Sequence, residues 1–90
     1  RTITFAITGP IARSDLAGLC KRVCSLFERG AVSVALCDVT NVEVDAVTVD
    51  ALARLQLAAR RRNCVVQLRN ASSELLELVE FMGLANVLAE

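Results

Sequence analysis

The residues that decide the fold run from Asp38 to Arg62 and read DVTNVEVDAVTVDALARLQLAARRR. An apolar, β-branched-rich segment at residues 32–37 precedes them and predicts a buried strand that ends near Asp38. After the loop at residues 41–45, apolar residues recur at helical spacing. They predict a helix over residues 47–62 with one core face, formed by Val49, Leu52, Leu55 and Ala59.

Polar residues mark both ends of this predicted helix. Asp45 or Thr48 can cap the free N–H groups at its start, and Asp50 lies in the first turn, where negative charge is favoured. Gln56 falls off the apolar stripe, as do Arg54 and the three arginines that close the helix at residues 60–62.

Strands and helices are expected to alternate along the whole chain. The predicted strands cover residues 2–8, 32–37 and 64–69, and the predicted helices cover 14–29, 47–62 and 73–81. Ser14 with Asp15 is expected to open the first helix and Gly30 to end it. This order indicates an α/β fold, a single domain over residues 1–90 with a small, mostly parallel sheet.

Parallel strands also predict where a site would lie. The loops after the three strands, at residues 9–13, 38–47 and 69–72, are expected to gather at one edge of the sheet. Ligands and partners usually dock at this edge in α/β domains.

The motif Asp38-Val39-Thr40-Asn41-Val42 resembles the strand end of the STAS domain, a module shared by sulfate transporters and bacterial anti-sigma factor antagonists. Residues 51–55 are similar to the leucine-rich helix that follows it in that family, Gly9 takes the place of a glycine after an early strand, and residues 82–84 resemble the C-terminal Gly-Leu turn. The chain begins at Arg1 without an initiator Met. We therefore expect a trimmed protein or a fragment, with room for a leading strand or fused domains.

The regulatory serine of the STAS family is replaced in this chain. Aligned without gaps, its position falls on Val47; one gap places Asp45 on the family's aspartate and Ala46 on the serine. Neither Ala46 nor Val47 can accept phosphate. Thr48 lies beside this position and is a candidate phosphorylation site, although we favour a capping role for it and a constitutive binder that has lost the switch.

The resemblance implies a non-catalytic, protein-binding regulatory module that binds a kinase-type anti-sigma factor. The alternative is a cytosolic accessory STAS subunit or tail of a membrane transport system, and a third hypothesis is small-ligand or nucleotide sensing at the same edge. The candidate partner-binding residues are Asp38, Asn41, Glu43, Asp45, Thr48 and Asp50.

Composition argues against several other functions. Ten basic and ten acidic residues give zero net charge, so nucleic acid and anionic membranes are poor partners. The chain has no histidine, no glycine-rich phosphate loop and no metal-ligand motif, so we expect neither an enzyme nor a cofactor. No apolar stretch is long enough to span a bilayer and no signal peptide is apparent, so a cytoplasmic location is expected.

The remaining chemistry-bearing residues also have simple structural interpretations. The four cysteines lie in apolar segments, so we expect buried thiols and not disulfides or zinc ligands: Cys20, Cys24, Cys37 and Cys64. The arginines at residues 60–62 could bind phosphate or an acidic partner, but a helix C-terminus favours cations in any case. Glu74, Glu77 and Glu80 are expected on the solvated face of the last helix.

Overall fold

The computed structural model describes residues 1–29 and 32–88, and it confirms an α/β fold whose helices alternate with strands. Gly30, the expected end of the first helix, lies outside the described residues. The elements are β1 (Thr2–Thr8), a 3-10 turn η1 (Arg13–Asp15), α1 (Leu16–Glu28), β2 (Val34–Asn41), α2 (Ala46–Arg60), β3 (Val65–Arg69) and α3 (Ser73–Phe81).

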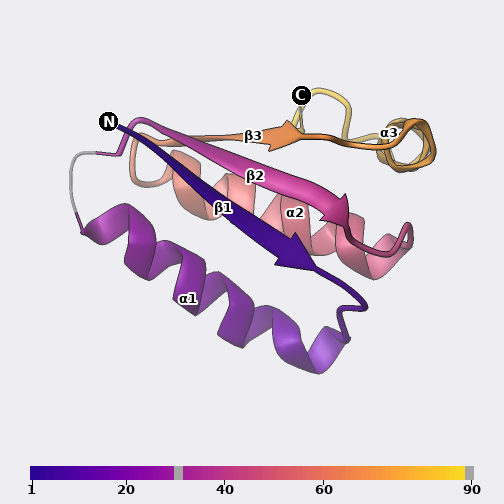
Figure 1. Ribbon diagram of the computed structural model, residues 1–90, viewed down its shortest axis with the longest axis horizontal. Coiled ribbons are helices and arrows are strands. Elements are labelled where there is room, and N and C mark those ends of the chain that lie inside the picture. Colours follow the sequence, from indigo (N-terminus) through magenta and orange to yellow (C-terminus); the bar gives the residue numbers. More distant parts are fainter. Residues whose placement is uncertain (30–31, 89–90) are drawn as a thin grey trace.

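The three strands form one parallel sheet in the order β1-β2-β3. Right-handed crossovers between neighbouring parallel strands place consecutive helices on one face, and Figure 1 shows α1 and α2 side by side on the same side of the sheet. Neither helix covers the other face. Across that face the strands align Thr4 with Leu36 and Leu36 with Gln67.

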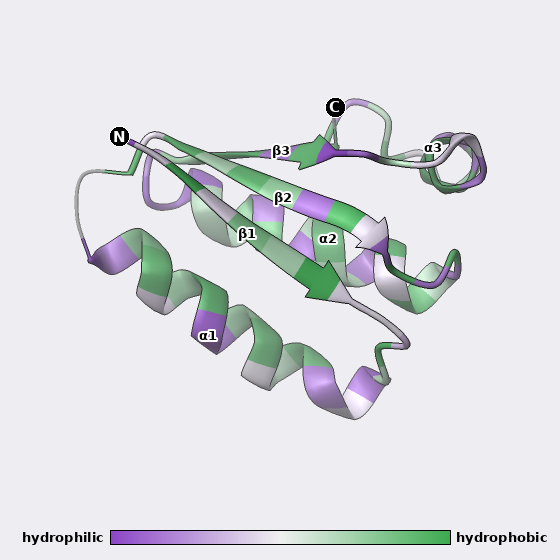
Figure 2. Cartoon of the chain, viewed as in Figure 1, coloured by the Kyte–Doolittle hydropathy of each residue, from purple (hydrophilic) through white to green (hydrophobic). Residues whose placement is uncertain are grey.

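The core lies between the sheet and the helices α1 and α2. Hydrophobic residues recur along all of these elements (Figure 2). Alternate residues of β2 point inward and are fully or almost fully buried, as are the predicted core residues of α2. The central members are Ala35, Cys37, Val39, Val49, Leu52, Leu55, Ala59, Val66 and Leu68.

Strand β2 continues to Asn41, so the prediction that it ends near Asp38 is wrong. Alternation explains the difference: Cys37 and Val39 point into the core, whereas Asp38 and Thr40 lie on the face without helices. Because the carboxylate of Asp38 is not placed in the core, β2 can continue past this residue without burying a charge.

Gln56 of α2 is buried, at 2% exposure, although the sequence pattern placed it off the core stripe. Its amide nitrogen donates to the carbonyl oxygens of Val66 (2.8 Å) and Val87 (3.0 Å), and its amide oxygen accepts from Val66 N (2.8 Å). Because β3 is an edge strand of the described sheet, Gln56 supplies the hydrogen bonds that a neighbouring strand would make, and it also fastens the C-terminal segment.

The cysteine prediction is confirmed for two residues and wrong for the other two. Cys37 and Cys64 are buried, and burial raises the pKa of the Cys37 thiol to about 12. Cys20 and Cys24 are only partly buried, because they lie on the side of α1 that borders a groove next to α2.

Candidate functional site

The loops at the carboxyl ends of the strands meet at one edge, as the sequence predicted. The backbone N–H of Gly9 donates to the carbonyl oxygen of Asn41 (3.0 Å), which joins the loop after β1 to the end of β2. The side-chain amide of Asn70 donates to Asp38 (3.3 Å), which joins the loop after β3 to the same strand. The β2–α2 loop, residues 42–45, is therefore held between its neighbours.

Gly9 is required by the close approach of two of these loops. A Cβ atom at this position would lie 2.7 Å from the backbone nitrogen of Glu43, closer than side chains approach in proteins. Any other residue at position 9 would displace the backbone that carries Glu43.

Asp38 acts as an acceptor for its neighbours. Its carboxylate accepts hydrogen bonds from the backbone N–H and hydroxyl of Thr40 and from Asn70. The bonds from Thr40, followed by that from Asn70, lower the pKa of Asp38 below its ordinary value. Asp38 is thus a charged group at neutral pH whose Oδ1 already accepts from three donors within the domain.

Asp45 caps α2. Its side chain accepts from the backbone N–H of Thr48 (2.8 Å), and its extended backbone precedes the first helical residue, Ala46. Of the two capping residues that the sequence allowed, the structure selects Asp45.

Thr48 is fully buried, and because Asp45 is the cap of α2 the prediction that Thr48 caps the helix is wrong. Among the described residues, its hydroxyl oxygen has no hydrogen-bond partner. A kinase cannot reach a side chain with 0% exposure in the native fold, and a partner protein cannot touch it. Thr48 belongs to the core.

Asp50 joins α2 to the segment before α1. Its carboxylate lies 3.3 Å from Arg54 Nε on the same helix and 3.7 Å from Arg13 Nη1. Arg13 was not predicted as part of the site, and no local pattern could have indicated it, because the contact depends on how α2 packs against the 3-10 turn η1.

Within residues 41–45, three side chains are exposed. Asn41 and Glu43 are exposed, and so is Val44, with 43% of its surface accessible. Val44 was missed in the sequence, where an apolar residue between two acidic ones in a loop was the available signal. We call Asn41, Glu43 and Val44 the loop surface.

The described part of the chain shows no cluster of three or more residues suited to hold a metal ion. It also contains no helix with the length and apolarity required to cross a membrane. Neither a scan against protein-family models nor a search of curated proteins finds a match to this chain.

Proposed function

We propose that this domain is a non-catalytic, protein-binding regulatory module of the kind that anti-sigma factor antagonists represent, and that it contacts its partner through the loop surface. The observation that supports this is an acidic and apolar loop, exposed at its tip and fixed at its base. The hydrogen bonds of Asp38, Gly9 and Asp45 hold the loop in one shape. A loop held in its binding conformation loses less entropy when it docks.

The arrangement favours a protein over a small ligand. Three surface cavities border α1, and none of them is lined by a residue of the loop surface. An exposed loop tip fits into a partner's concave surface, whereas small ligands need enclosure. Val44 would supply buried apolar area in such a contact, and Glu43 would supply charge.

Regulation by phosphate at the start of α2 is not part of the proposal. Ala46 and Val47 have no hydroxyl, and Thr48 is buried. We therefore propose that the domain binds a kinase-type anti-sigma factor constitutively. Phosphorylation at the start of α2 does not control this binding.

Co-purification from the native host tests this proposal. The full-length protein would be tagged, and partners identified by mass spectrometry for the wild type, Glu43→Arg and Glu80→Arg. Glu80 is exposed on α3 and makes the same charge change away from the loop surface. We expect a kinase-type ATPase with the wild type and Glu80→Arg, and its loss with Glu43→Arg. A transporter ATPase or permease would instead support the accessory-subunit alternative, and equal recovery with all three proteins would refute the loop surface.

A further inference from the structure

Charge is distributed unevenly in this neutral chain. Basic residues concentrate on α1, α2 and the turns that flank them, whereas α3 carries three glutamates and no basic residue. The zero net charge therefore conceals a basic region and an acidic region on the same domain.

The basic region contains a groove between α1 and α2. Two adjoining depressions form it, of about 290 and 490 Å³, and they share Cys20, Ala58 and Arg61. Four cationic side chains and one carboxylate line it: Lys21, Arg54, Arg61, Arg62 and Glu28. Its apolar part includes the side chain of Leu57, and Leu57 is 50% exposed to solvent.

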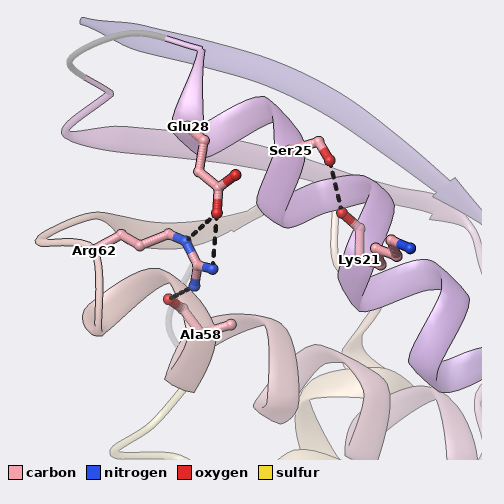
Figure 3. A network of polar contacts seen from close by, with 5 residues as sticks. All are labelled: Lys21, Ser25, Glu28, Ala58 and Arg62. Carbon is pink, nitrogen blue, oxygen red and sulfur yellow. Dashed lines mark hydrogen bonds and ion pairs between the residues drawn. The ribbon is translucent and has the colours of Figure 1, made fainter.

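One ion pair, between Glu28 and Arg62, crosses the groove. Figure 3 shows Arg62 between the two helices, donating to Glu28 of α1 at 3.0 Å and to the carbonyl oxygen of Ala58. Arg54 is paired with Asp50 toward the other end. Among the described residues, Lys21 and Arg61 form no salt bridge, so their charges are available to an incoming anion.

The outer face of α3 has the complementary chemistry. Glu74, Glu77 and Phe81 follow one another at i, i+3 and i+7, which places them on one stripe of the helix. All three are exposed, and Phe81 is 87% exposed. The stripe therefore combines two carboxylates with an accessible aromatic ring that could bury apolar area against a partner.

We propose that α3 of one copy of this chain docks in the α1–α2 groove of a second copy. Glu74 and Glu77 would face Lys21 and Arg61, and Phe81 would cover Leu57. The chain that has the basic, apolar groove also has an acidic, apolar stripe, so a second copy supplies the charge that the groove lacks.

The contact joins two different copies of the chain. In Figure 1, α1 lies under the β1 side of the sheet and α3 lies at the β3 side, so a domain cannot fill its own groove with its own α3. Two different surfaces meet, so the contact can repeat from copy to copy into a ring or an open chain, or two copies can make it twice about a twofold axis. The loop surface takes no part in either region, so this proposal does not depend on the proposed function.

Sedimentation velocity measures the expected self-association. The average mass of the wild type should rise between about 10 µM and 1 mM protein in about 0.02 M salt, and fall toward the monomer in about 0.5 M salt, where charges are screened. Phe81→Ser should weaken association by about ten-fold or more, since it removes the apolar contact without changing charge.

Two charge-reversed variants give the decisive test. A groove variant carries Lys21→Glu and Arg61→Glu, and a helix variant carries Glu74→Lys and Glu77→Lys. Each should be monomeric alone, because each lacks one of the two surfaces. Mixed together they should associate, since the α3 of the groove variant meets the unchanged groove of the helix variant, and the two reversed surfaces are also opposite in charge.

Controls separate this result from misfolding and from general charge effects. Circular dichroism melts verify that each variant is folded, and Arg69→Glu, an exposed cation outside the groove, should associate like the wild type. A wild type that stays monomeric at 1 mM in low salt would overturn the proposal. So would self-association of either folded double variant, or a mixture that remains monomeric.

Discussion

Thr48 and Gln56 are the two buried polar side chains of α2, and they stand in opposite situations. Gln56 makes three hydrogen bonds, which complete the edge of β3 and hold the C-terminal segment. The hydroxyl of Thr48 has no partner among the described residues. Gln56, near the C-terminal end of α2, therefore links this helix to β3 and to the C-terminal segment. The hydroxyl of Thr48, in the first turn, links α2 to no other described residue.

This difference has a functional consequence. The burial of Thr48 and Val49 turns one side of the first turn of α2 toward the core, whereas Ala46 is exposed, and we place the proposed contact on residues 41–44. The contrast between Thr48 and Gln56 also predicts that similar substitutions at the two positions change stability in opposite directions.

Replacing Gln56 should have the largest effect. Gln56→Leu keeps the size of the side chain but leaves the N–H and C=O groups of Val66 buried without partners, so the free energy of unfolding should fall by about 2 to 5 kcal/mol. Urea denaturation measures this. Gln67→Leu, on the sheet face without helices, is the matched control and should change little. Equal effects of the two substitutions would show that the Gln56 network contributes nothing.

Removing the cap at the near end should have a smaller effect. Asp45→Ala leaves the N–H of Thr48 without its acceptor, and the free energy of unfolding should fall by about 1 kcal/mol. Glu43→Ala, two residues earlier in the same loop, should stay within about 0.5 kcal/mol of the wild type. Comparable losses in both variants would argue that Asp45 is not the cap.

Thr48 should show the opposite sign. Thr48→Val replaces the unpartnered hydroxyl with a methyl group of similar shape, so the free energy of unfolding should rise by about 1 kcal/mol. Thr4→Val, at an exposed position of β1, is the control for the general effect of this exchange in a folded domain. A stability loss specific to Thr48→Val would mean that its hydroxyl has a partner after all.

The smallest effect concerns pH and Asp38. Hydrogen bonds from Thr40 and Asn70 lower the pKa of Asp38 in the folded state, so its carboxylate stabilises the fold above its ordinary pKa of 3.8. This contribution disappears as the pH falls through the lower, folded-state pKa. The stability difference between the wild type and Asp38→Asn should therefore shrink between about pH 5 and pH 2. A difference that stays constant over this range would contradict the role of the charged form.

Much of the fold could be predicted from the sequence because its information is local. Apolar periodicity located all three strands and all three helices, and α3 begins and ends where predicted. Ser72 lies in the loop predicted at residues 69–72, and its hydroxyl accepts from the N–H of Leu75. Hydrophobic spacing and capping chemistry act over a few residues, so a single sequence contains them.

The wrong predictions concern polar residues that were placed by their residue type and not by their position in the periodic pattern of the helix or strand. Thr48, Leu52 and Gln56 are spaced at i, i+4 and i+8, so they share one face, and the burial of Leu52 was a signal that its neighbours are buried too. Asp38 was taken for a strand end although it alternates with Cys37 and Val39. The pairing of Arg13 with Asp50 had no such signal, because it depends on tertiary packing.

The central claim is that a partner meets residues 41–44 and not the first turn of α2. The most direct measurement compares the amount of the co-purified partner held by Glu43→Arg and by Thr48→Val, each at a temperature where circular dichroism shows it folded. We predict that Thr48→Val holds as much partner as the wild type and that Glu43→Arg holds little or none. Loss of the partner with Thr48→Val and its retention with Glu43→Arg would contradict the claim.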